Sequence, residues 1–132
     1  MNHITELQTR YCESDALGHI NSVSYFIYLE QARVNFILDS KIISNIKDWP
    51  FVLASIRCDL KRQIYINDFL LIKSFISEIN QSSFKLEHEI YNKDSHELLA
   101  VGSVVIVHFN FDEQKSVVLS SDMRKKLKEF KK

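Results

Sequence analysis

Glycine and proline are rare in this sequence of 132 residues, which contains only two glycines and one proline. These residues mark linkers, low-complexity segments and many repeat units, and the chain shows none of these features. A chain of this length is typical of one domain and can bury about two-thirds of its unfolded surface. We therefore expect a single domain over residues 1–132.

Cysteine is scarce as well. Cys12 and Cys58 are too few for a disulfide framework or a structural zinc site, and a reduced, cytoplasmic setting is expected. The histidines are scattered along the chain without the close spacing of a metal cluster: His3, His19, His88, His96 and His108. The sequence thus predicts no metal and no cofactor.

Excess charge and long apolar runs are also absent. The formal net charge is zero and the isoelectric point is about 7.0, so no global field favours nucleic acid or an anionic membrane. No apolar run approaches the roughly 20 residues that span a bilayer. Asn2, His3 and Thr5 interrupt any run that would resemble a signal peptide. We expect no nucleic-acid partner and no membrane insertion.

The most informative stretch runs from Asp15 to Arg33. Its first half is a polar loop with a carboxylate at Asp15, an imidazole at His19 and an amide at Asn21, and Gly18 lies in its middle. Glycine is favoured where φ is positive or where a ligand approaches the backbone closely. The loop leads into a helix, whose first backbone N–H groups have no partner within the helix and can bind an anion.

The helix is predicted from its period. Apolar residues recur at the spacing of one helix face: Tyr25, Leu29, Ala32 and Phe36. Asn21 or Ser22 can cap its start, and Asp39-Ser40 marks its end. Because apolar residues cover much more than one face, we expect a central helix that is wrapped by other structure.

Alternating apolar and polar residues predict strands on both sides of this helix. They are expected within residues 3–12, then at Phe51–Ile64, Phe69–Ile79, 84–90, Leu98–Phe109 and Ser116–Leu119. Short turns join the later strands into an antiparallel meander. Gly102 inside a long strand indicates a bulge or a close backbone approach. Ser121 or Asp122 caps a basic terminal helix that runs to Phe130.

A sheet with one apolar face must be covered, and the long apolar helix is the only candidate in the chain. The predicted fold class is therefore α+β: the hot-dog fold, an antiparallel β-sheet wrapped around a long central α-helix. One sheet over one helix leaves strand edges unpaired, and an oligomer that pairs sheets edge to edge would cover them.

The stretch from position 10 to position 33 resembles the opening signature of the 4-hydroxybenzoyl-CoA thioesterase-like hot-dog family. The resemblance rests on the spacing of these residues: Arg10, Tyr11, Asp15, Gly18, His19, Asn21, Tyr25, Tyr28, Glu30, Ala32 and Arg33. It continues through Ser82-Ser83-Phe84 and the long strand at 97–109, and so covers nearly the whole chain. It implies one hot-dog thioesterase domain with sites at a homodimer or homotetramer interface.

In that family the loop aspartate is the catalytic carboxylate, and amides at the start of the central helix polarise the thioester carbonyl. Carried over, these roles fall to Asp15 and to the amides of Ser22, Val23 and Ser24. The chemistry is consistent, because thioester hydrolysis needs a general base or nucleophile and donors for the developing oxyanion. Helix N-terminal amides and the helix dipole are such donors. Gly18 would let a substrate approach the loop backbone.

Other residues of the stretch have two interpretations each. His19 is a second catalytic residue, acting as general base, or a hydrogen-bonding loop residue. Asn21 caps the helix or contacts substrate, and Tyr25 is a core aromatic or a substrate contact. Glu30 pairs with Arg33 one turn on, or it faces the site.

The predicted function is hydrolysis of a small or medium acyl-CoA to free acid and coenzyme A, which is part of the substrate and not a cofactor. Two alternatives stay open: a thioesterase for acyl carrier protein, and a non-catalytic acyl-binding hot-dog protein. The Asp15 carboxylate argues against the second. Two basic patches contact coenzyme A phosphates or are simply solvated: Arg57, Lys61 and Arg62 form one, and Arg124–Lys126 the other.

Two departures from the family pattern affect the substrate channel more than the chemistry. Ser22 stands where many relatives have a second asparagine. The segment 64–68 replaces the usual turn with proline and glycine.

Overall fold

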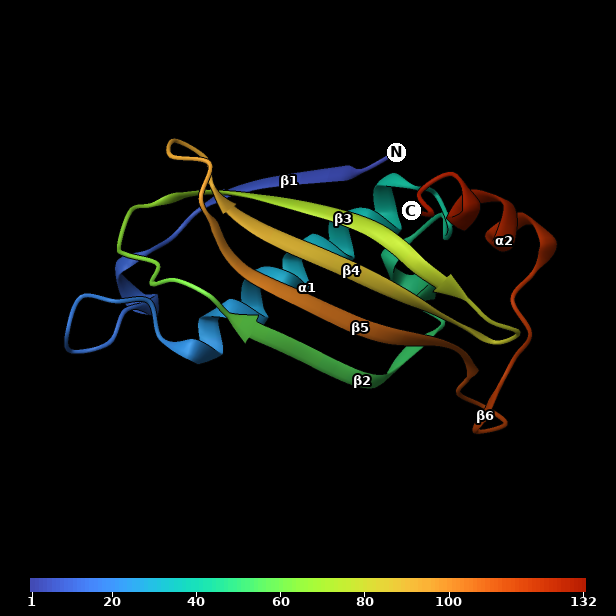
Figure 1. Cartoon of the computed structure of the whole chain (residues 1–132). Helices are drawn as coiled ribbons and strands as arrows, with labels where there is room; N and C mark the ends of the chain where they lie inside the picture. Colours follow the sequence, from blue (N-terminus) through green and yellow to red (C-terminus); the bar gives the residue numbers. More distant parts are fainter.

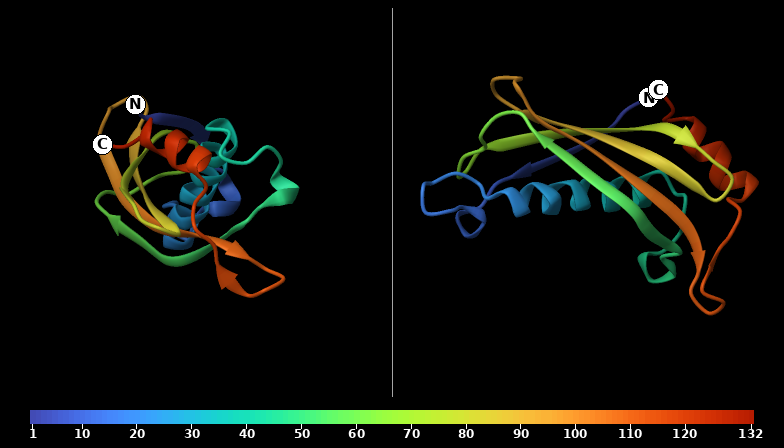
Figure 2. Two further views of the ribbon diagram at one scale, coloured as in Figure 1. Left: turned by 90° about the vertical axis from the view of Figure 1, so that its right-hand side faces the viewer. Right: turned by 60° about the horizontal axis from the view of Figure 1, so that its bottom comes forward.

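In the computed structural model, which describes residues 1–132, helix α1 (Ser22–Asp39) lies along the concave side of a curled antiparallel sheet (Figure 1). The strands are β1 (His3–Gln8), β2 (Phe51–Leu60), β3 (Phe69–Ile79), β4 (Ser83–Asn92), β5 (Leu98–Asn110) and β6 (Lys115–Ser116). Two 3₁₀ turns, η1 (Tyr11–Glu13) and η2 (Ile46–Asp48), and helix α2 (Ser121–Lys128) complete the fold. Figure 2 shows the sheet curving around α1, which confirms the predicted α+β hot-dog fold.

The strand order is β1-β3-β4-β5-β2, and every neighbouring pair is antiparallel. The predicted hairpins that join β3 to β4 and β4 to β5 are therefore confirmed. A meander that begins at β2 would pair β2 with β3; this part of the prediction is wrong, because β2 pairs with β5 at the opposite edge of the sheet. The chain leaves the sheet where the amides of Lys61 and Arg62 both bind the Leu99 carbonyl. It then crosses to the loop before α1, where Ile20 N–H donates to Ile64 O at 2.8 Å.

Element boundaries differ from the predictions at several ends. β1 stops at Gln8, and the following residues form η1 instead of a longer strand. β2 stops at Leu60, four residues before the predicted end, and β6 contains only two residues. Asn21 caps α1 as predicted, with its side chain accepting the Ser24 N–H. α2 is capped by Ser120, one position before the two predicted candidates, because its hydroxyl accepts the Met123 N–H.

The core divides into two apolar clusters with a polar row between them. One cluster includes Ile76, Leu86 and Val104 beside the second half of α1, and the other includes Ile72, Ile90 and Ala100 beside its first half. Between these two rows the sheet register places five smaller or polar residues side by side: His3, Ser74, His88, Gly102 and Cys58. The polar row therefore crosses the whole sheet beneath the middle of α1.

Three members of this row are buried: Ser74, His88 and Gly102. A Cβ at Gly102 would lie 2.6 Å from Leu29 Cδ1, so the glycine serves the predicted close approach, here between α1 and β5. His88 is 2% exposed and shares a 2.7 Å hydrogen bond between its Nδ1 and Ser74 Oγ, while its Nε2 has no partner. Arg33 of α1 is also buried, at 6% exposure.

The sheet wraps α1 as predicted, but within the single chain one face of the helix stays uncovered. Val23, Phe26 and Ile27 remain exposed on one face of α1. Leu53, Ile56 and Leu60 of the edge strand β2 are exposed as well. By the register with β5, these three β2 residues lie on the same side of the sheet as its buried residues. Neither helix is both long enough and apolar enough to cross a membrane.

Candidate active site

The loop between η1 and α1 is closed on itself around Asp15. The Asp15 N–H donates to the His19 carbonyl at 2.7 Å, and Ser14 and Ile20 form an isolated antiparallel bridge. The Asp15 side chain accepts the N–H groups of Leu17 at 2.8 Å and His19 at 3.2 Å, both on Oδ1. These two bonds fix the carboxylate and leave Oδ2 free for a water or a substrate atom.

Gly18 has φ = 82°, which confirms that this loop needs a left-handed residue. Because no atom lies within 4 Å of a Cβ built there, a substitution meets backbone strain and no clash. We expect Gly18→Val to lower the free energy of unfolding by about 1–2 kcal/mol and to displace Asp15. Gly18→Asn, which tolerates this conformation, is the matched control and should cost less. Denaturant unfolding measures the loss of stability, and turnover reports the displacement of Asp15. Full stability and full turnover of Gly18→Val would show that the loop does not need a glycine at this position.

Helix α1 begins directly after this loop, and its first turn holds free donors. The Ser24 amide is already used, because it donates to the side chain and carbonyl of the capping Asn21 at 2.9 and 3.1 Å. The amides of Ser22 and Val23 precede it in the first turn, where an α-helix supplies no acceptor of its own. Of the three predicted oxyanion donors, the amides of Ser22 and Val23 are therefore available and the amide of Ser24 is not.

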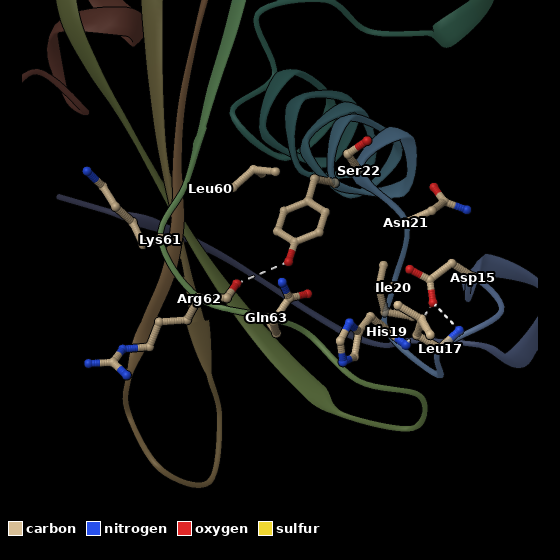
Figure 3. A pocket seen from close by; sticks show the side chains of 11 residues that line it. Asp15, Leu17, His19, Ile20, Asn21, Ser22, Leu60, Lys61, Arg62 and Gln63 are labelled. Atoms are coloured by element: carbon tan, nitrogen blue, oxygen red, sulfur yellow. Dashed lines mark hydrogen bonds between the residues drawn. The ribbon is translucent and has the colours of Figure 1, made fainter.

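A cavity of about 620 Å³ opens between this loop and the end of β2 (Figure 3). It is lined by Asp15, Leu17, His19, Ile20, Asn21, Ser22, Tyr25, Leu60, Lys61, Arg62 and Gln63. One wall is the loop with the start of α1, and the other is the segment that follows β2. Tyr25 joins the two walls, since its hydroxyl donates to the Arg62 carbonyl at 3.1 Å. Burial raises the pKa of Tyr25, so this hydroxyl stays a donor.

A family model described as the thioesterase-like superfamily matches residues 10–127. The chain belongs to this superfamily. It is 30% identical to the uncharacterized protein YsmA of Bacillus subtilis, over 92% of this chain and 82% of that one. It is 25% identical to the long-chain acyl-CoA thioesterase FadM of Escherichia coli, over 95% of this chain and 96% of FadM. The structure of a predicted thioesterase from Bacillus stearothermophilus superposes with a TM-score of 0.91 at 26% identity, covering 100% and 98% of the two chains.

Membership of the thioesterase-like superfamily confirms both the family resemblance and the enzyme class, thioester hydrolase, that the sequence predicted. The matched range includes the loop, α1 and the segment after β2, and thus the whole lining of the cavity. The roles of individual residues in this thioesterase stay predictions.

Five of the predicted site residues line the cavity of this thioesterase: Asp15, His19, Asn21, Ser22 and Tyr25. The His19 ring packs edge-to-face against Tyr65 at 5.2 Å, and only its backbone N–H reaches the Asp15 carboxylate. Asn21 acts as the helix cap, which is one of its two predicted interpretations.

Four predicted residues lie outside the cavity lining: Gly18, Val23, Ser24 and Glu30. Gly18 shapes the loop backbone, and the Ser24 side chain is buried beneath the helix start. The Glu30 carboxylate lies 3.6 Å from Arg33 Nη2 with 65% of its side chain exposed, as the pairing interpretation expects. Helical period alone does not say on which side of α1 the cavity lies. The sequence therefore could not exclude Glu30 or Val23 from the cavity lining.

Sequence reasoning missed Glu13, and it considered Lys61 and Arg62 for their charged side chains and not as a wall of the cavity. Glu13 ends η1, two residues before Asp15, and its buried carboxylate binds Arg10 and Tyr28. A buried carboxylate in a polar, irregular segment leaves no periodic signal, although Arg10 and Tyr28 stand in the family signature. Lys61 and Arg62 form part of the cavity wall through their backbone, whereas their side chains point away from Asp15 (Figure 3).

The basic patches are largely paired within the protein. Arg62 lies 3.2 Å from the Glu97 carboxylate and Arg57 lies 3.3 Å from Asp59. In the other patch, Arg124 donates to two backbone carbonyls. No three His, Cys, Asp or Glu side chains converge on a point where they could hold a metal ion.

Proposed function

We propose that this thioesterase hydrolyses acyl-CoA, releasing the free acid and coenzyme A. The observation that carries the proposal is that Asp15 and Ser22, whose amide opens the first turn of α1, border one cavity. The cavity volume, about 620 Å³, falls within the usual range of small-molecule sites and supports a small or medium acyl group. The similarity to FadM, a long-chain acyl-CoA thioesterase, supports coenzyme A as the thiol carrier.

In the proposed reaction the thioester carbonyl oxygen accepts the amide of Ser22 or Val23, where the helix dipole also stabilises negative charge. Asp15 Oδ2 either removes a proton from the attacking water or attacks the carbonyl carbon itself. The carbon–sulfur bond then breaks, and the thiolate leaves with the electron pair and takes up a proton. On the first route this step releases the free acid directly; on the second it leaves an anhydride between the acyl group and Asp15, which a water molecule hydrolyses to the free acid and the Asp15 carboxylate. His19 lies in the same cavity and is the second group that can accept or return a proton.

The test is a thiol-release screen of the purified protein over short, long and aromatic acyl-CoAs. We expect turnover on at least one acyl-CoA, with the best substrate among the short and medium chains. The same acyl group on acyl carrier protein distinguishes the two carriers, because a carrier-protein thioesterase would prefer the protein-bound form. Binding of acyl-CoA without any thiol release would support the non-catalytic alternative.

The exposed apolar face of α1 and β2 supports an oligomer, and we propose a homodimer or a homotetramer. Val23, Phe26 and Ile27 together with Leu53, Ile56 and Leu60 leave apolar side chains in water beside an unpaired strand edge. A second copy of the chain would cover both.

We expect Ile56→Asp to dissociate the protein into monomers, because a carboxylate in an apolar contact surface is desolvated without a partner. Val118→Asp is the matched control: Val118 is similarly exposed but lies outside this face, so the oligomer should persist. Sedimentation velocity at micromolar concentration measures both. A wild-type protein that sediments as a clean monomer would contradict the assembly.

A further inference from the structure

Glu13 is a buried carboxylate that the proposed reaction does not use. Its side chain is only 8% exposed, although the neighbouring Asp15 loop is largely exposed. Oε1 accepts hydrogen bonds from the Tyr28 hydroxyl at 2.7 Å and from the Arg10 backbone N–H at 2.8 Å. Oε2 accepts two from the Arg10 guanidinium, at 2.9 and 3.1 Å. These bonds occupy both oxygens, so Glu13 cannot serve as the general base in place of Asp15.

The backbone of Glu13 binds the start of α1 as well. Its carbonyl accepts the Asn21 N–H at 3.0 Å and the Ser24 hydroxyl at 3.4 Å. Asn21 in turn caps the helix through the Ser24 N–H. One residue therefore fixes the first turn of α1, which holds the free amides, relative to the segment that carries Asp15.

The charge states in this cluster favour a constant geometry. Burial opposes ionisation of Glu13, but the hydrogen bonds from Tyr28 and Arg10 outweigh it and lower the pKa of the carboxyl. Burial, followed by the hydrogen bond to Glu13, raises the pKa of Tyr28. Glu13 therefore stays ionised and Tyr28 stays protonated through the neutral pH range, so the hydrogen bond between them persists. The proposed reaction, which needs an ionised Asp15, takes place in the same range.

We infer that Glu13 is a positioning residue: held by Tyr28 and Arg10, it sets the Asp15 carboxylate and the first amides of α1 in their reactive arrangement. This inference rests on the proposed function. A displacement of about 1 Å between reacting groups can cost about 100-fold in rate. Glu13 does not line the cavity, so its disturbance changes the reaction geometry without removing a substrate contact.

Tyr28→Phe is the sharpest test, because it removes one hydroxyl and keeps the buried ring. We expect kcat on the best acyl-CoA to fall about tenfold while KM stays within about twofold. Tyr91→Phe is the matched control: it deletes a tyrosine hydroxyl that also binds a glutamate, at 3.2 Å from Glu89 Oε1. That control should keep the wild-type kcat. A Tyr28→Phe enzyme that is folded and turns over like Tyr91→Phe would overturn the inference.

Glu13→Gln keeps the side-chain shape and removes the charge that binds Arg10, and should lower kcat at least as much as Tyr28→Phe. Amide hydrogen exchange provides a readout independent of activity. Exchange at Asn21 and Ser24 should accelerate in both variants, whereas exchange in the central strands should not change. If the wild-type protein hydrolyses no acyl-CoA, the proposed function fails, and the exchange data alone decide whether Glu13 positions the loop. Unchanged exchange at Asn21 and Ser24 would then overturn the inference.

Discussion

Asp15→Asn is expected to lower kcat on the best acyl-CoA at least about 100-fold and to change substrate affinity little. Asparagine has nearly the same shape but lacks the basicity and the nucleophilicity of the carboxylate. Its side-chain oxygen can still accept the N–H groups of Leu17 and His19 that now bind Asp15 Oδ1, so the loop should keep its conformation. The α1 amides and the cavity walls remain, which is why binding should persist.

The competing interpretation is that Asp15 only braces the loop. Asparagine is itself a good turn and cap residue, so in that case Asp15→Asn would keep both the wild-type rate and the melting temperature. Asp122→Asn, on α2 and outside the cavity lining, is the matched control for loss of one carboxylate. A near wild-type rate for Asp15→Asn with an unchanged melting temperature would contradict the assignment of Asp15 as general base or nucleophile.

The second large effect is a loss of folding stability at acid pH, and it is expected from His88 in the buried polar row. Burial, with smaller contributions from Arg33 and His3, lowers the pKa of His88 from 6.5 to about 3. Between these values the unfolded chain binds a proton at His88 and the folded protein does not, so stability falls as the pH is lowered. We expect His88 to reduce the free energy of unfolding by about 2–3 kcal/mol between pH 6.5 and about pH 4.5.

Urea unfolding at several pH values measures this loss. The double variant Ser74→Ala, His88→Leu removes both partners of the buried hydrogen bond and leaves no orphaned group, and its pH dependence in this window should be much shallower. His96→Asn removes an exposed histidine from a turn with positive φ, which asparagine tolerates, and should retain the wild-type slope. Equal slopes for the wild type and the double variant would contradict a buried neutral His88.

Periodicity was sufficient for the fold class because it reports which residues face a core. The helical spacing around Leu29 and Phe36 predicts α1, and strict alternation over residues 84–90 predicts β4 within its observed bounds. Periodicity does not report which strands pair. β2 alternates as β4 does, yet it pairs with β5 and not with β3, because the crossing segment 61–68 is held by backbone bonds to Leu99 and Ile20 that carry no side-chain signal.

The candidate site was predictable where its chemistry is local in sequence. The polar Asp15 loop, Gly18 and the start of α1 are consecutive, and the family signature marks them. The opposite cavity wall after Leu60 and the Glu13–Tyr28 contact are long-range features. The side of α1 that Glu30 occupies likewise depends on packing, so the sequence left its two roles open.

The most direct test of the account is a crystal structure with an acyl-CoA analogue in which a methylene group replaces the thioester sulfur, so that it cannot be hydrolysed. The account predicts the analogue carbonyl oxygen within hydrogen-bond distance of the Ser22 or Val23 amide. It also predicts Asp15 Oδ2 beside the carbonyl carbon or bound to a water that faces it. An analogue that binds with its carbonyl remote from both the start of α1 and Asp15 would contradict the account.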